Sequence, residues 1–94
     1  MGVVKWTEDV LADMAGIHEY IAKDSVAYAD KLLDSFFERV QVLVGQPNSG
    51  RVVPEKNDVS VREVFEGNYR IVYTTKYLPD IIILRVLRFS QRLV

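Results

Sequence analysis

Apolar positions recur at helical spacing in the first half of the chain. Spacings of four, three and four residues place one stripe on a single helix face: Val10, Met14, Ile17 and Ile21. Thr7 lies just before this stripe and can cap the helix, because its hydroxyl can accept a hydrogen bond from a free N–H of the first turn. The apolar run at residues 3–6 precedes the cap and predicts a short strand.

A second and longer stripe follows a short polar break, in which Asp24 or Ser25 can cap a new helix. Its members again share one helix face: Ala29, Leu33, Phe36, Val40 and Leu43. Gly45 is expected to end this helix in the left-handed conformation, and Pro47 cannot continue it. Two amphipathic helices joined by a short turn predict an antiparallel hairpin, whose joint apolar stripe needs a sheet to cover.

The second half of the chain alternates between turn formers and short apolar runs. Residues 45–60 are rich in Gly, Pro, Asn and Ser and predict a long loop without regular structure, and loops of this length are often functional. Three strands are expected to follow, beginning at Val61, Tyr69 and Ile81, with short turns between them. The predicted fold class is therefore α+β with the order β-α-α-β-β-β, in which the last three strands form an antiparallel meander.

The composition of the 94 residues narrows the class of protein. A hydrophobic fraction of 49% and a charged fraction of 27% are ordinary for a globular chain, and the length predicts one domain over residues 1–94. The chain has no cysteine and one histidine, which excludes disulfides and thiolate metal sites and leaves no basis for predicting a metal or a cofactor. Its beginning lacks the pattern of a secretory signal and no apolar run reaches about 18 residues, so a cytoplasmic protein without a membrane partner is expected.

The net charge of −1 conceals an asymmetry between the two halves. Residues 1–44 carry 4 Lys or Arg against 8 Asp or Glu, a net charge of −4. Residues 45–94 carry 8 against 5, a net charge of +3, and six of these eight basic residues are arginine. Any surface that binds anions is therefore expected in the second half.

Arginines lie inside the last two predicted strands. Because side chains alternate across a strand, one hairpin register sets Arg70 opposite Arg88, and a slip of one residue places Arg70 on the face of Arg85. Two arginines on one face are costly unless an anion or a carboxylate lies between them. Either these arginines lie on a solvated sheet face beside carboxylates at its surface, or they form a site for a phosphate or a carboxylate. The candidate surface partners are Glu55, Glu63 and Glu66.

Three tyrosines accompany these arginines. Tyr69, Tyr73 and Tyr77 recur every four residues and are expected to share one strand face. Such a stripe is typical of the half-buried face beneath two helices, but next to arginines it can also stack on RNA bases. The sequence leaves both interpretations open.

Three segments together resemble the RelE/ParE superfamily of toxins from type II toxin–antitoxin modules. They are PNSGRVVPE, VREVFEGNYRIVYTTKY and IIILRVLRF, in this order and spacing, and the resemblance extends over nearly the whole chain. It implies a small, twisted, mostly antiparallel sheet packed on a hairpin of two N-terminal helices. It also implies an antitoxin partner whose C-terminal segment is disordered alone and wraps the toxin, in a hetero-oligomer that reaches operator DNA only through the antitoxin.

The superfamily divides by the target of the free toxin. RelE-like members cut mRNA in the ribosomal A site, whereas ParE-like members poison DNA gyrase and cut nothing themselves. For a ribonuclease, the resemblance implies Glu55 as the base and Arg70 as the group that stabilises the phosphate, with Arg88 as a third candidate catalytic residue. Where nuclease members often have a histidine or tyrosine as the acid, this chain has Arg88 and Phe89, which cannot donate a proton at neutral pH.

The missing acid and the slightly acidic net charge favour the ParE-like branch, which is a binding protein and not an enzyme. The alternatives are a ribosome-dependent mRNA endoribonuclease and a member that only pairs with an antitoxin. In the favoured case, one set of residues in the second half is expected to contact the target or the antitoxin: Arg51, Arg62, Arg70, Arg85, Arg88, Phe89 and Arg92.

Overall fold

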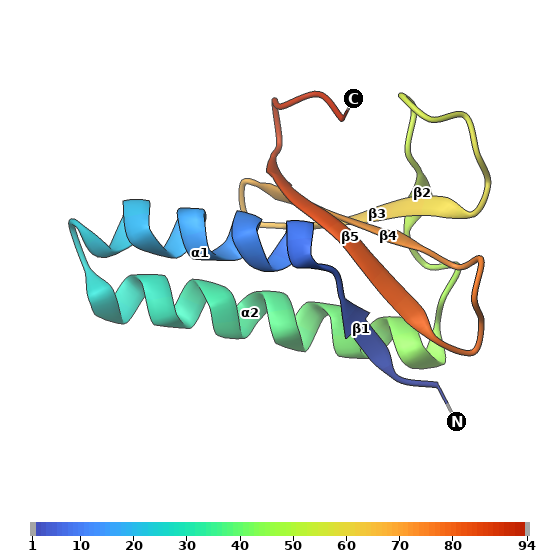
Figure 1. Cartoon of the computed structure of the whole chain (residues 1–94), viewed down its shortest axis with the longest axis horizontal. Coiled ribbons are helices and arrows are strands. Elements are labelled where there is room, and N and C mark those ends of the chain that lie inside the picture. Colours follow the sequence, from blue (N-terminus) through green and yellow to red (C-terminus); the bar gives the residue numbers. More distant parts are fainter. Residues whose placement is uncertain (1, 94) are drawn as a thin grey trace.

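A computed structural model describes residues 2–93, which form two helices and a five-stranded sheet (Figure 1). The sheet has the order β1-β5-β4-β3-β2, in which β1 pairs with β5 in parallel and the other neighbours are antiparallel. In chain order the elements are β1 (Val4–Trp6), α1 (Glu8–Ala22), α2 (Val26–Gly45), β2 (Arg51–Val52), β3 (Val61–Glu66), β4 (Tyr69–Thr74) and β5 (Ile81–Arg88). The predicted α+β class and the helical hairpin on a mostly antiparallel sheet are confirmed.

The two helices begin at the predicted caps. The Thr7 hydroxyl accepts a hydrogen bond from the Val10 N–H at 3.2 Å, and the Ser25 hydroxyl accepts one from the Tyr28 N–H at 3.1 Å. Thr7 also donates to the carbonyl of Ile83 at 3.0 Å, which ties the start of α1 to β5. The caps therefore set where the hairpin begins and how it meets the sheet.

The core lies between the hairpin and one face of the sheet. Its helical members come from the predicted stripes, and its strand members come from the helix-facing side of β3, β4 and β5. The buried residues are Val10, Met14, Phe36, Val40, Leu43, Val64, Ile71, Tyr73, Ile81, Ile83 and Val86. A smaller apolar cluster covers the opposite sheet face and consists of Val53, Val72, Leu87 and Leu93.

The β4–β5 register decides between the two predicted arrangements of the arginines. Tyr69 pairs with Arg88 and Arg70 pairs with Leu87, so Arg70 does not lie opposite Arg88. By alternation Arg70 shares its sheet face with Arg85, which pairs with Val72. Beyond Val72 the pairing shifts by one residue at a bulge, which sequence alternation alone does not predict.

Three local predictions are wrong. The loop over residues 45–60 contains a short strand, β2, because Arg51 and Val52 pair with β3. Gly45 does not take the predicted left-handed conformation but forms the last residue of α2. Among residues 2–93, the glycine with a positive φ is Gly67. Strand β4 ends at Thr74, so Tyr77 lies exposed in the following turn, while Tyr69 and Tyr73 pack beneath the helices, which is the first of the two interpretations.

Within residues 2–93, neither helix combines the length and apolar character that crossing a lipid bilayer requires.

Candidate functional site

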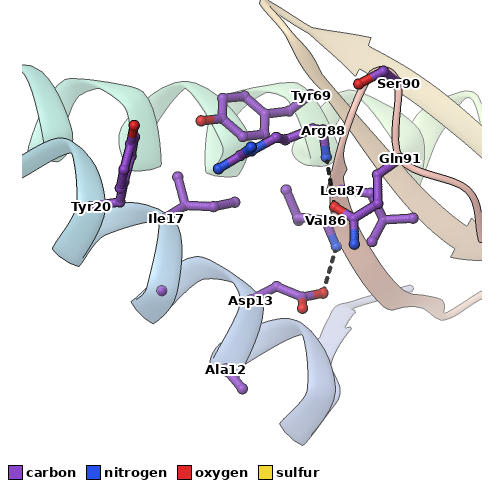
Figure 2. A pocket seen from close by; sticks show the side chains of 11 residues that line it. Ala12, Asp13, Ile17, Tyr20, Tyr69, Val86, Leu87, Arg88, Ser90 and Gln91 are labelled. Carbon is purple, nitrogen blue, oxygen red and sulfur yellow. Dashed lines mark hydrogen bonds between the residues drawn. The ribbon is translucent and has the colours of Figure 1, made fainter.

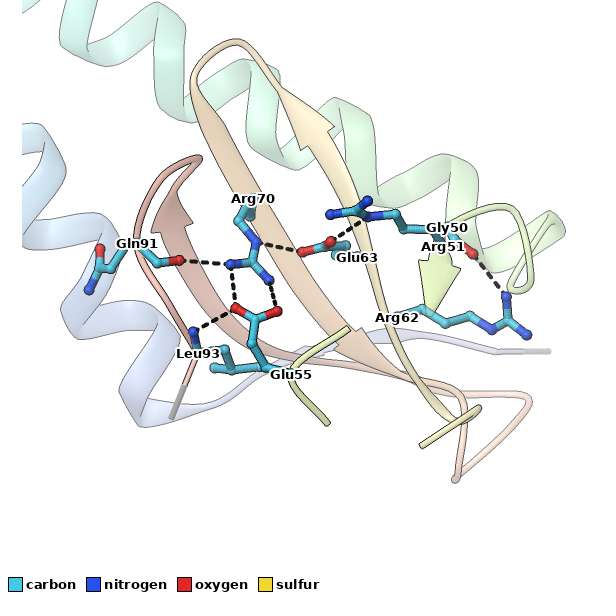
Figure 3. Close-up of polar contacts among 8 residues, drawn as sticks. All are labelled: Gly50, Arg51, Glu55, Arg62, Glu63, Arg70, Gln91 and Leu93. Atoms are coloured by element: carbon cyan, nitrogen blue, oxygen red, sulfur yellow. Dashed lines mark hydrogen bonds and ion pairs between the residues drawn. The ribbon is translucent and has the colours of Figure 1, made fainter. Parts of the chain in front are cut away.

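Arg70 occupies the centre of a buried ion-pair network on the sheet face that the helices leave open (Figure 3). Its guanidinium binds Glu55 through two parallel hydrogen bonds, Nη1 to Oε2 at 2.8 Å and Nη2 to Oε1 at 2.9 Å. Its Nε donates to Oε1 of Glu63 at 2.6 Å. The side chains of Glu63, Arg70 and Glu55 are 0%, 6% and 12% exposed, so these charges are held almost entirely by one another.

Arg51 completes the network from the sheet edge. Its Nε donates to Oε2 of Glu63 at 2.6 Å, so this buried carboxylate is held by an arginine on each side. Two guanidinium groups and two carboxylates then balance in charge, which is the condition under which buried ions are tolerated. The idea of a solvated arginine face is therefore wrong for Arg70, although Glu55 and Glu63 are among its predicted partners.

The C-terminal segment, residues 89–93, folds over this network. The carbonyl of Gln91 accepts a hydrogen bond from Arg70 Nη1 at 2.7 Å, and the N–H of Leu93 donates to Oε2 of Glu55 at 3.0 Å (Figure 3). The Leu93 side chain is buried in the apolar cluster with Val53 and Leu87. The ion pair is thereby covered by chain on the side that would otherwise face solvent.

These contacts change the acid–base properties of the pair. Hydrogen bonds from Arg70, and then from the Leu93 N–H, lower the pKa of Glu55 from 4.5 to about 2. The hydrogen bonds with Glu55 in turn raise the pKa of Arg70 above its ordinary value. A carboxylate this acidic binds a proton only weakly, so Glu55 is poorly suited to act as a general base near neutral pH.

Tyr73 anchors the loop that precedes β2. Its hydroxyl donates to the carbonyl of Pro47 at 2.7 Å and accepts from the N–H of Gly50 at 3.0 Å. Arg62 supports the same loop, because its Nη1 donates to the carbonyl of Gly50 at 2.9 Å. Arg62 thus stabilises the conformation of the loop. Burial raises the pKa of the Tyr73 phenol above its ordinary value.

Arg85 is bound by α1. Its Nε and Nη2 donate to the two carboxylate oxygens of Asp13 at 2.7 and 2.9 Å, and the N–H of Val86 donates to the same carboxylate at 2.9 Å. Strand β1 pairs only with residues 81–83 of β5, so Asp13 satisfies a backbone donor on the edge that β1 leaves open. The two arginines that share a face, Arg70 and Arg85, therefore each have their own carboxylate.

Arg88 stands at a groove of about 720 Å³ between α1 and the end of β5 (Figure 2). Its guanidinium lies over the ring of Tyr20, 5.7 Å from the centroid, and Tyr69 lines the same groove. The side chain of Ile17 adds an apolar wall. The groove thus combines an exposed cation with two phenol rings, which suits a partner that carries both acidic and apolar side chains.

A second exposed feature is the aromatic pair of Phe65 and Phe89, whose ring centroids are 5.3 Å apart. Phe89 is 61% exposed, and Arg51 lies over Phe65 with its guanidinium 5.1 Å from the ring centroid. Arg92 is also exposed in the adjoining segment. Exposed aromatic and arginine side chains of this kind are enriched at protein interfaces.

The predicted binding residues therefore divide into two groups. Arg62, Arg70 and Arg85 bind other parts of the chain, whereas Arg88, Phe89 and Arg92 are exposed. Arg51 belongs to both groups, because it binds Glu63 and still remains largely exposed. Sequence reasoning missed the groove residues of α1, chiefly Asp13 and Tyr20. Their spacing of seven residues, with Ile17 between them, puts them on one helix face and was the available signal.

Comparison with known proteins places the chain in a family. Residues 4–93 match the family model described as the ParE toxin of type II toxin–antitoxin system, parDE. A solved structure titled "Chromosomal ParDE TA system from P. aeruginosa" is similar at 26% identity and a TM-score of 0.77, covering 96% of this chain and 98% of that one. No curated protein sequence gives a significant match. The match over nearly the whole chain, together with the shared fold, shows that this protein belongs to the ParE toxin family of type II toxin–antitoxin systems.

Proposed function

We propose that this ParE family chain arrests growth by binding and poisoning DNA gyrase, and that a cognate antitoxin neutralises it. One observation carries the choice of gyrase over RNA cleavage. Two of the three candidate catalytic residues, Glu55 and Arg70, are closed into one buried ion pair, while the third, Arg88, stands exposed beside Phe89. Exposed residues of this kind favour a protein that acts by binding. With gyrase as its target, it would act in the cytoplasm, where gyrase meets DNA.

Metal-independent RNA cleavage needs a base, a cation for the phosphate and an acid for the leaving oxygen. The base position is disfavoured because the pKa of Glu55 is about 2 and both of its oxygens accept hydrogen bonds from Arg70. The cation position is disfavoured because Arg70 already donates to Glu55, Glu63 and the carbonyl of Gln91. A phosphate would have to displace these partners before it could bind.

The tyrosines do not supply the missing acid. Tyr69 directly precedes Arg70 on β4, so the two side chains point to opposite faces of the sheet. Tyr20 lines the groove on the helix side with Tyr69. A phenol on one face of the sheet cannot serve a phosphate held on the other, which argues against one assembled nuclease site.

The antitoxin partner is inferred from the family and from the accessible surface. The similar solved structure is described as a ParDE system. On this chain, the groove at Arg88 and the exposed pair of Phe65 and Phe89 would suit a segment with acidic and apolar side chains that wraps the toxin. Binding to operator DNA would come from the antitoxin, since the toxin itself carries a net charge of −1.

The deciding experiment is pulse labelling in a bacterial host after this chain alone is induced. Thymidine incorporation should fall within minutes while leucine incorporation continues, because a poisoned gyrase blocks replication before translation is affected. In the matching assay with purified proteins, the chain should increase gyrase-dependent DNA cleavage. Earlier collapse of leucine incorporation, with cut mRNA, would instead support the ribonuclease alternative.

Neutralisation needs a separate measurement. Co-expression of the antitoxin encoded beside this chain should restore growth, and the purified pair should bind with nanomolar or tighter affinity if the segment wraps the toxin. Growth that remains arrested in the presence of a bound antitoxin would contradict the proposed partnership.

A further inference from the structure

Two members of one ion pair hold two backbone groups of the C-terminal segment. Arg70 donates to the carbonyl of Gln91, and Glu55 accepts from the N–H of Leu93. The same two side chains are joined by two hydrogen bonds, from both terminal nitrogens of Arg70 to both carboxylate oxygens of Glu55. The position of residues 89–93 is therefore coupled to the geometry of this pair.

We propose that Glu55 and Arg70 form a clamp that fixes residues 89–93 on the open sheet face and so positions Arg88 and Phe89 toward the target. In this account both are positioning residues, and neither reacts with or touches the target. The fixing of residues 89–93 is a property of the protein alone, whereas the positioning of Arg88 and Phe89 toward a target rests on the proposed action on gyrase.

The segment has few other means of staying in place. After Phe89, whose N–H donates to the carbonyl of Asn68, it no longer pairs with the sheet. The Gln91 N–H donates to the carbonyl of Arg88 at 3.0 Å, so the chain turns back on itself at this point. What then brings it onto the sheet is the burial of the Leu93 side chain together with the two bonds to the clamp.

The clamp is itself held from behind. Glu63 accepts from Arg70 Nε at 2.6 Å, and Arg51 holds the second oxygen of Glu63 at the same distance. These contacts fix the plane of the Arg70 guanidinium, so its remaining N–H groups point to Glu55 and to Gln91 (Figure 3). The network therefore provides a rigid support from which to orient a short segment.

The positioned residues, Arg88 and Phe89, precede Gln91 and Leu93, the two residues that the clamp bonds directly. Arg88 lies over Tyr20 at the groove, while Phe89 packs on Phe65 outside it. Adjacent residues that face two different partners need a fixed backbone, because a shift of the segment would remove one contact or the other. The strand fixes this backbone from one end, and the clamp fixes it from the other.

Amide hydrogen exchange in the full-length chain tests the clamp directly. Glu55→Ala removes the acceptor of the Leu93 N–H and should speed exchange at Leu93 roughly tenfold to a hundredfold, the range expected for a hydrogen bond to a charged group. Glu55→Gln retains a carbonyl acceptor and should restore part of the protection. The amide of Ile71 in the core exchanges through global unfolding, so its acceleration measures the stability that each variant loses and separates that loss from the local release of Leu93.

Arg51→Ala is the matched control, because it removes a charge from the same network without touching the C-terminal segment. Leu93 should keep its protection in this variant. Unchanged exchange at Leu93 in Glu55→Ala, or equal acceleration in Arg51→Ala, would overturn the clamp.

A cycle of variants tests the consequence for the target. Leu93→Ala removes the apolar anchor of the segment but keeps both side chains of the ion pair. It should raise the toxin concentration needed to stimulate gyrase cleavage by roughly tenfold, a loss typical of a weakened contact surface. If Glu55 acts only through the segment, Glu55→Ala should add little to this loss in the double variant. Additive losses would show that Glu55 acts elsewhere and would overturn its positioning role.

If the unmodified chain leaves gyrase unaffected, the proposed function fails, while exchange at Leu93 still decides the clamp.

Discussion

Arg70 and Glu55 form a two-pronged ion pair at 2.8 and 2.9 Å although 15 residues separate them in sequence. The pair lies on the sheet face away from the helices and beneath the C-terminal segment (Figure 3). Its position explains why arginine occurs inside a strand of this hairpin. Arg70 does not form an anion site open to solvent; it closes two buried carboxylates and a terminal segment into one unit.

Replacement of Arg70 is expected to destabilise the protein strongly. Arg70→Ala should lower the free energy of unfolding by about 3–5 kcal/mol, because it leaves Glu63 without its buried partner. Arg51→Ala should cost about 0–1 kcal/mol, since Arg51 is 56% exposed and Glu63 keeps Arg70. Denaturant unfolding of both variants measures the difference. Equal losses would mean that Glu63 is held mainly from the sheet edge.

The clamp predicts a loss of stability in acid. Because the pKa of Glu55 is about 2 in the folded state and ordinarily 4.5, the unfolded chain binds the proton first as the pH falls. The contribution of Glu55 to stability is therefore complete above about pH 4.5 and is lost as the pH falls toward 2. Unfolding curves between pH 6 and 2 should show a shallower decline for Glu55→Gln than for the unmodified chain. Parallel curves would contradict the assigned ion pair.

Arg88 is expected to be a main contact for the target. Arg88→Glu reverses the charge at the groove and should raise the concentration needed to poison gyrase at least roughly 30-fold, as for an interface arginine worth about 2 kcal/mol. Lys76→Glu makes the same charge change in the turn at the other end of the hairpin and should leave the concentration nearly unchanged. A gyrase cleavage titration compares the two. Equal effects would mean that only net charge matters.

Gly50 is expected to tolerate no side chain. A Cβ at this position would lie 2.5 Å from the Tyr73 hydroxyl and 2.6 Å from the carbonyl of Glu63, so Gly50→Ala should cost about 1–3 kcal/mol. Gly16→Ala is the opposite case, because a Cβ there meets nothing within 4 Å and alanine favours the helix by about 1 kcal/mol. Thermal unfolding should show a lower midpoint for the first variant and a higher one for the second.

Much of the architecture could be predicted from local pattern. The helical stripes, the caps at Thr7 and Ser25 and the three long strands depend on residues close in sequence, and all of them appear in the structure. The family was also predicted from three segments, and the match over residues 4–93 confirms it. The strand β2 was missed because a run of two residues is too short to show alternation, and it becomes a strand only when β3 lies beside it.

What the sequence by itself determined is which residues face a common side of each helix or strand, since side-chain periodicity is a property of the local backbone. What only the tertiary structure decided is the register of the hairpin and the partner of each arginine. Arg70 meets Glu55 and Gln91 from 15 and 21 residues away, and Arg85 meets Asp13 from 72 residues away. Such pairs depend on how packed segments approach one another, and neither composition nor alternation contains that information.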